Sequence, residues 1–176
     1  MLIGIDASTT ATGFAFGGPN DGKPKGGVWK GMGANELVFD QTLASMSESL
    51  SLLARAVKAQ RVCIEAPLLI NDHAGAAHTT MALIQLTGAL RAAAKRAGCL
   101  VTLVAVSTVR KHFIGVGNMP SAKAKDAVQK RCDQLGWTYQ GHDHADANAV
   151  WCWGMSSFFP KWSPNGTPLF AQGARA

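Results

Sequence analysis

The sequence is short of acidic residues, and the few that it has are placed selectively. Eleven Asp and Glu stand against 17 Lys and Arg, which gives a formal net charge of +6 over 176 residues. Such an excess favours a polyanionic partner such as nucleic acid, although it also occurs in proteins that bind none. Four of the eleven acids close a predicted strand or lie at the start of a predicted helix, so their placement marks a candidate site.

Paired cysteines, a secretion signal and long apolar runs are missing as well. The four cysteines are far apart and form no CxxC pair, which argues against a tetrahedral zinc site and against a secreted disulfide framework. Cys63 and Cys152 fall in apolar patterns, where cysteine acts as a small hydrophobic residue. No signal peptide is apparent, and no apolar run reaches the roughly 18 residues of a membrane span. We therefore expect a soluble protein in a reducing compartment.

The length and the absence of repeats bound the number of domains. A chain of 176 residues that is 47% hydrophobic can bury one good core but not two. The segment 160–176 is rich in Pro and Gly and has few periodic apolar positions. We expect one domain over residues 1–159 and an irregular C-terminal tail over 160–176.

The order of predicted elements indicates an α/β fold with a mixed five-stranded sheet flanked by helices. Turn residues over 17–24 separate two strands of a hairpin, and helices that lead into later strands imply parallel crossovers. The run 100–106 is so uniformly apolar that we expect a strand buried on both faces. Strands are expected at 2–6, about 13–17, about 26–32, 61–65 and 100–106. Helices are expected at 35–59, 78–97, 107–114, 121–135 and from about 143, with Asn35, Ser107 or Thr108, and Ser121 as caps.

The four selected acids are predicted to converge. Asp6 and Glu65 close two strands, and if these strands are parallel neighbours, both carboxylates lie at the same edge of the sheet. Asp143 and Asp146 are three residues apart, so they share one face of a helix start, where the helix dipole favours negative charge. Each acid could instead cap or pair locally.

A set of four carboxylates suits a hard divalent cation. Oxygen donors without cysteine favour Mg²⁺ or Mn²⁺, and such clusters can hold two ions that clamp the attacking and leaving oxygens of a phosphodiester. His142 and His144 flank the third and fourth acids. They could complete a His-Asp-His-x-Asp zinc site, His144 could act as an outer-shell or proton-transfer group, or both could be exposed bystanders.

Three motifs together resemble the RuvC family of Holliday-junction resolvases. They are Gly4-Ile5-Asp6 with Ser8 and Gly13, then Cys63-Ile64-Glu65, then Asp143-His144-Ala145-Asp146-Ala147. The likeness extends to Leu86–Leu90, Val109–Gly117 and Lys123–Val128, and thus covers about residues 2–155.

The resemblance implies a fold, an activity and a set of roles. It implies a ribonuclease-H-like fold and a homodimer that resolves four-way DNA junctions by paired nicks, a crossover junction endodeoxyribonuclease of DNA recombination and repair. Asp6, Glu65, Asp143 and Asp146 would be the catalytic residues and would hold two Mg²⁺ or Mn²⁺ ions per active site. No small-molecule substrate and no membrane is implied, and the expected location is the cytoplasm of a bacterium or of a phage-infected host cell.

The sequence also departs from the family pattern. The usual Pro-Gly after the first Asp is Ala7-Ser8, and the usual Gln after the Glu is Ala66-Pro67. Where bacterial members often have an aromatic residue that stacks at the junction, this chain has Leu68, Leu69 and Ile70. The insertion 17–25 and the tail are further differences. We interpret the chain as a divergent member, such as one from a phage, and the sequence leaves selectivity between junctions, forks and flaps open.

The basic residues suggest where DNA would bind, and the tryptophans suggest which residues lie in the core. Arg110, Lys111, Lys123 and Lys125 match family positions near the active site, so we expect them to contact DNA phosphates. Lys130 and Arg131 are assigned to a solvated helix face. Trp151 and Trp153 lie in an apolar run and are expected in the core, while the sequence does not decide the role of Trp162.

Two other functional classes and a related nuclease compete with this interpretation. The stretch Asp6–Thr10 resembles the first phosphate loop of actin-like ATPases and sugar kinases, but those proteins need two domains and a second loop. A non-catalytic DNA-architectural protein on the same fold would be expected to have a broken acidic set, whereas all four acids are present. A nuclease acting on flaps, forks or RNA would carry the same site residues.

Paired nicks in a two-fold junction are matched most simply by a two-fold protein. The helix expected at 78–97 is the candidate interface, because small and apolar residues recur on it at helical spacing. The same stripe could equally be the buried face of an ordinary amphipathic helix. Its members are Ala82, Leu83, Leu86, Ala89, Leu90 and Ala93.

Overall fold

The computed structural model describes residues 1–67 and 74–164, apart from the side chains of 36–37 and 74–76. The strands are β1 (Leu2–Asp6), β2 (Ala11–Gly17), β3 (Lys25–Lys30), β4 (Arg61–Glu65) and β5 (Leu100–Val104). The helices are α1 (Glu36–Ala56), α2 (Ala74–Arg96), α3 (Val106–Ile114), α4 (Ser121–Leu135) and α5 (Gly141–Phe158). The predicted order of elements is thus confirmed.

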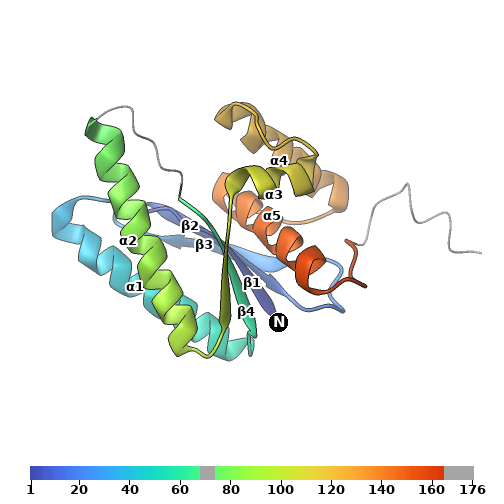
Figure 1. Ribbon diagram of the computed structural model, residues 1–176, viewed down its shortest axis with the longest axis horizontal. Helices are drawn as coiled ribbons and strands as arrows, with labels where there is room; N and C mark the ends of the chain where they lie inside the picture. The colour runs from blue at the N-terminus through green and yellow to red at the C-terminus, as the bar shows by residue number, and fades with distance from the viewer. Residues whose placement is uncertain (68–73, 165–176) are drawn as a thin grey trace, which may run out of the picture.

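The strands form one mixed sheet in the order β3-β2-β1-β4-β5. β1 pairs antiparallel with β2 and β2 with β3, whereas β1–β4 and β4–β5 are parallel. Helices α1 and α2 lie on one side of the sheet, and α3, α4 and α5 gather on the other (Figure 1). The predicted α/β architecture with a five-stranded mixed sheet is confirmed, and it places the carboxyl ends of β1 and β4 at the same edge.

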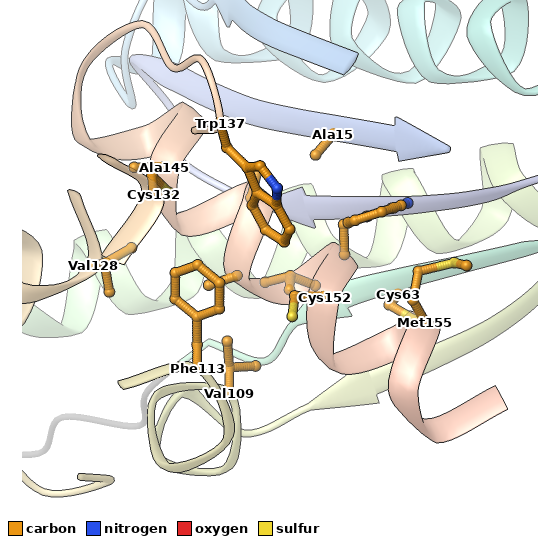
Figure 2. Packing of buried hydrophobic residues seen from close by; sticks show 14 of the residues in the cluster. Ala15, Cys63, Val109, Phe113, Val128, Cys132, Trp137, Ala145, Cys152 and Met155 are labelled. Carbon is orange, nitrogen blue, oxygen red and sulfur yellow. The ribbon is translucent and has the colours of Figure 1, made fainter. Parts of the chain in front are cut away.

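Side-chain alternation along β1 divides the core into two layers. Ile3 and Ile5 pack with α1 and α2, while Leu2 faces the other way and packs with α5. In the layer around α5, Figure 2 shows Phe113 beside Trp137, and their rings stack with centroids 5.8 Å apart. The sheet is therefore covered on both faces near its centre, where the candidate acids end their strands.

The prediction of a fifth strand buried on both faces is wrong. β5 ends at Val104, and Val106 already begins α3. Leu100 is 55% exposed and Leu103 is 38% exposed, because β5 is an edge strand and the helices cover it incompletely. An apolar run indicates a strand, but the run does not tell whether a neighbour covers each of its faces.

Several predicted helix starts also differ from the structure. Ser121 is the first residue of α4 and not its cap, and Pro120 precedes the helix without a side-chain cap. Ala105, and neither Ser107 nor Thr108, precedes α3. The last helix begins at Gly141, two residues before Asp143, and α2 begins at Ala74 instead of near His78. In contrast, α1 follows Asn35 directly, as predicted.

The small and apolar stripe on α2 belongs mostly to the core. Leu86, Leu90 and Ala93 are fully buried and Ala82 nearly so, and Leu86 and Leu90 belong to the core cluster between α1, α2 and the sheet. Leu83 and Ala89 are partly buried. The amphipathic-helix interpretation of this stripe is therefore the one that holds within the single chain, and any interface on α2 must use its opposite face.

The cysteines and tryptophans behave largely as predicted. All four cysteines are buried and none is paired. Trp151 is fully buried, whereas Trp153 is only partly buried. Trp162, undecided from sequence, is buried against Trp151 with ring centroids 5.1 Å apart, so the start of the tail is anchored to the domain. No helix of the described residues is long and apolar enough to span a membrane.

Candidate active site

Two of the predicted site residues end adjacent parallel strands. Ile5 of β1 stands opposite Ile64 of β4 in the parallel register, so Asp6 and Glu65 are the next residues along two neighbouring strands. Side chains at equivalent positions of paired strands point to the same face. The expectation that Asp6 and Glu65 reach the same edge of the sheet is confirmed by this register.

Two glycines bring the start of α5 down onto this edge. Gly13 of β2 pairs with Asp6 of β1, and a side chain on Gly13 would collide with the backbone carbonyl of Asp143. A side chain on Gly4 would likewise meet the backbone of α5 at Trp151. The helix therefore rests directly on the strand backbones, which sets Asp143 next to the β1–β2 pair, with Asp146 one turn further along.

The pKa values show that the four acids affect one another. Burial raises the pKa of Asp6 well above its usual range, and the negative charges of Glu65, Asp146 and Asp143 raise it further. Burial and then the charge of Asp146 raise the pKa of Glu65 to about 7. Burial is also the main cause that raises the pKa of Asp146 to about 6. Since all four side chains keep part of their surface accessible, a ligand can still reach them.

Two cations from other helices face the acids. Arg110 of α3 and Lys125 of α4 each lower the pKa of Asp146, and both are partly buried. The charge of Arg110 also acts on the acid that ends β4, and that of Lys125 on the acid that ends β1. Lys111 and Lys123 are exposed. The four residues predicted to contact DNA thus divide into an inner pair beside the acids and an outer pair at the surface.

The acids fit a hard divalent cation by chemistry, though not as a preformed cage. In the described part of the chain, no three of the His, Cys, Asp and Glu side chains are spaced to ligate one ion. The donors near one another are carboxylate oxygens, whose pKa values are raised first by burial and then by the charges of the neighbouring acids, and a bound divalent cation would offset both effects. Mg²⁺ commonly keeps several waters and uses only one or two carboxylates, so a loose set suits it.

His144 is turned toward the sheet and does not complete a zinc site. Its Nδ1 accepts a hydrogen bond from the backbone N–H of Gln140 at 3.0 Å. Its Nε2 is buried beside Gly26 of β3 and has no hydrogen-bond partner among the described residues. His142 is exposed, and its charge lowers the pKa of Asp146. His144 therefore braces the start of α5, while its outer-shell role stays a prediction.

Sequence reasoning missed two residues that hold the site in shape. Thr12 closes the turn after Asp6, because its hydroxyl donates to the carbonyl of Ser8 at 2.7 Å and accepts from the Ser8 N–H at 3.2 Å. Asn148 is fully buried in α5, and its amide donates to the carbonyl of Thr138 at 3.2 Å. A single amide within an otherwise apolar helical run was the available signal for Asn148. The residues Leu68, Leu69 and Ile70 lie outside the described residues.

Comparison with known proteins gives matches in structure but not in sequence. No protein-family model and no curated protein sequence matches the chain. The structure of Thermus thermophilus RuvC in complex with a Holliday junction substrate superposes with a TM-score of 0.65 at 18% identity, covering 85% of this chain and 88% of that one. A second Thermus thermophilus RuvC structure gives 0.61 at 19% identity, covering 85% and 89%.

A eukaryotic resolvase has the same architecture. The crystal structure of the yeast mitochondrial Holliday junction resolvase Ydc2 superposes with a TM-score of 0.54 at 16% identity, covering 87% of this chain and 76% of that one. Each of these likenesses covers at least 85% of this chain. The chain therefore has the ribonuclease-H-like fold of the RuvC resolvases.

Proposed function

We propose that this protein is a metal-dependent, structure-selective endonuclease that resolves four-way DNA junctions by paired strand nicks. The observation that carries the proposal is the gathering of four electrostatically coupled acids from β1, β4 and α5 at one sheet edge. The RuvC structure solved with a Holliday junction substrate supports the choice of DNA partner.

In this proposal Asp6, Glu65, Asp143 and Asp146 hold two Mg²⁺ or Mn²⁺ ions. When bound, the ions would supply an activated water and would stabilise the charge on the attacking and leaving oxygens. The chain itself contributes a partly buried edge, which limits competing water around the acids. Burial and mutual repulsion make the charged acids unfavourable when no cation is bound. A bound cation would remove that repulsion, so part of its binding free energy would come from this relief.

The basic residues position the DNA in this proposal. Arg110 and Lys125 stand beside the acids, where they would draw a phosphate toward the metal-binding edge without touching a base. Lys111 and Lys123 are exposed and would hold neighbouring phosphates of the duplex arm. Contacts of this kind give affinity and register but carry no sequence information.

We also propose a homodimer, because paired nicks require two sites related by a two-fold axis. The exposed face of α2 is the candidate interface. Met81 is 57% exposed and Ile84 is 40% exposed, and Gly88 lies one turn further along the same face with nothing within 4 Å of a Cβ placed on it. A helix that presents apolar and small residues to solvent can pack closely against its own symmetry mate.

A cleavage assay on a set of DNA substrates tests the proposed activity. Purified protein would be incubated with Mg²⁺ or Mn²⁺ and labelled four-way, three-way, flap and linear DNA, and with an RNA strand of the same sequence. We expect the four-way junction to be cut fastest, with symmetric nicks in two strands of like polarity. Faster cutting of the flap or the RNA would assign the site to a related nuclease, and binding without any cutting would indicate an architectural protein.

A further inference from the structure

A surface pocket lies at the end of the sheet opposite the acids. Its volume is about 570 Å³, within the range of ligand-binding pockets. It is formed by the turn after β2, by the last residue of α5 and by the segment that follows α5, and its mainly apolar walls are Pro19, Phe158, Phe159, Pro160 and Trp162. Because β2 runs antiparallel to β1, the turn after Gly17 lies beside the start of β1 and away from Asp6.

The walls of the pocket are held in place by contacts between the two segments. The indole N–H of Trp162 donates to the backbone carbonyl of Asp21 at 3.0 Å, and the ring packs edge-on against Trp151. The Asp21 carboxylate accepts from the N–H of Gly18 at 2.7 Å, which fixes the turn. A pocket with fixed walls loses little conformational entropy when a ligand enters it.

The surroundings of the pocket are positively charged. Lys161 lines the pocket, and the guanidinium of Arg61 lies 3.7 Å above the ring centroid of Phe158. Lys23 lies in the turn that forms the opposite wall, and Lys25 begins β3 directly after it. Within the two wall segments, 17–25 and 158–164, Asp21 is the only acid. Among the residues that the structure describes, an apolar hollow with a cationic rim is therefore open at this end of the molecule.

We propose that this pocket docks a short acidic peptide segment of a partner protein, with one bulky apolar side chain in the hollow and flanking carboxylates on the rim. Charge complementarity favours this occupant over the chain's own tail, because residues 165–176 contain Arg175 and no acid. Duplex DNA would satisfy the cations but has no side chain to fill an apolar hollow. The site is independent of the proposed nuclease activity and could bind its partner while the opposite end binds DNA.

Fluorescence anisotropy with a defined peptide tests the proposal. The probe is a fluorescein-labelled peptide in which a Phe–Leu pair is flanked by aspartates, titrated with the full-length protein. We expect saturable binding that weakens with added NaCl and is lost when the Phe–Leu pair is replaced by Ala–Ala or the aspartates by asparagines. Lys161→Glu should weaken binding about five- to tenfold, because it removes one attraction and adds one repulsion at an exposed site.

The controls separate this proposal from its rivals. Lys130→Glu, an exposed lysine on α4, should leave peptide binding unchanged, and Lys161→Glu should leave junction cleavage unchanged. Equal peptide binding by wild type and Lys161→Glu would overturn the proposal, as would no binding at all. Tighter peptide binding after truncation at Pro164 would assign the pocket to the tail instead. A loss of duplex DNA affinity in Lys161→Glu would assign the rim to nucleic acid.

Discussion

Burial and the charge of Asp146 raise the pKa of Glu65 to about 7, well above the range of a glutamate in an unfolded chain. Between the unfolded and folded pKa values the folded protein binds more protons than the unfolded one. The folded protein therefore becomes less stable as pH rises from the unfolded to the folded pKa of Glu65. At pH 8 the carboxylate is charged in both states, and the full free-energy penalty of burying its charge is present. The attraction of Arg110 offsets only part of it.

Replacing Glu65 by Gln should therefore stabilise the metal-free protein at pH 8. We expect a gain of about 1–3 kcal/mol in the free energy of unfolding, measured by urea denaturation in EDTA. At pH 5 the wild-type Glu65 is already protonated in the folded state, so the gain should shrink toward zero. A variant that is less stable than wild type at pH 8 would show that Glu65 is better paired than its burial indicates.

The outer lysines should act on DNA affinity alone. Lys111→Ala and Lys123→Ala each remove an exposed charge, so each should weaken junction binding and flatten the slope of log affinity against log salt by up to about one unit. Lys130→Ala on the same helix as Lys123 serves as the control and should leave the slope unchanged. An unchanged slope of log affinity against log salt in the variant that combines Lys111→Ala with Lys123→Ala would place the DNA path elsewhere.

At the scale of elements, the sequence predicted the strands that carry acids better than it predicted their surroundings. The short apolar runs at β1 and β4 end on their acids, and the structure confirms both boundaries. The exposed face of β5 was missed because an apolar pattern carries no information about which neighbour covers it. The buried position of His144, which accepts a hydrogen bond from the Gln140 N–H and lies beside Gly26 of β3, was also missed. A histidine next to an acid suggests a metal ligand before it suggests a buried structural contact.

Because α5 lies directly against the sheet, adding a single methyl group at Gly4 should lower the stability of the protein. Gly4→Ala would place a Cβ against the backbone of α5, and backbone cannot rotate away as a side chain can. We expect a loss of about 1–3 kcal/mol in urea denaturation, together with slower junction cleavage because Asp143 moves with the helix. Gly88→Ala is the matched control in protein diluted to the monomer, because Gly88 lies on the proposed dimer face but a Cβ on it would meet nothing within 4 Å in its own chain. There it should gain about 0.5–1 kcal/mol. Equal stability of the two variants would contradict the tight α5–sheet contact.

At the scale of the whole molecule, the fold could be predicted from element order and the four acids from their positions, but the sequence could not tell which face of α2 is buried in the chain. The stripe from Ala82 to Ala93 is periodic because it packs inside the chain, and periodicity alone cannot distinguish a core from an interface. The solvent exposure of large apolar residues, here Met81 and Ile84, separates the two faces of α2.

The exposed face of α2 predicts how the oligomeric state should change. Ile84→Glu places a charge on a side chain that the single chain does not bury, so the variant should fold but sediment as a monomer at micromolar concentration. Leu52→Glu on α1 is the control, because Leu52 is 60% exposed on a different helix, and it should remain dimeric. A wild-type protein that sediments as a monomer with and without junction DNA would refute the homodimer.

A substitution at the acidic sheet edge tests most directly whether this edge is a metal-dependent nuclease site. Wild-type protein and the variant Asp6→Asn would be compared for cleavage of a labelled four-way junction in Mg²⁺ and, separately, for junction binding in EDTA. We expect the variant to lose cleavage by several orders of magnitude yet to bind at least as tightly as wild type, because removal of a negative charge cannot weaken attraction to phosphate. Near-normal cleavage by Asp6→Asn would contradict the assignment of this edge as a metal-dependent nuclease site.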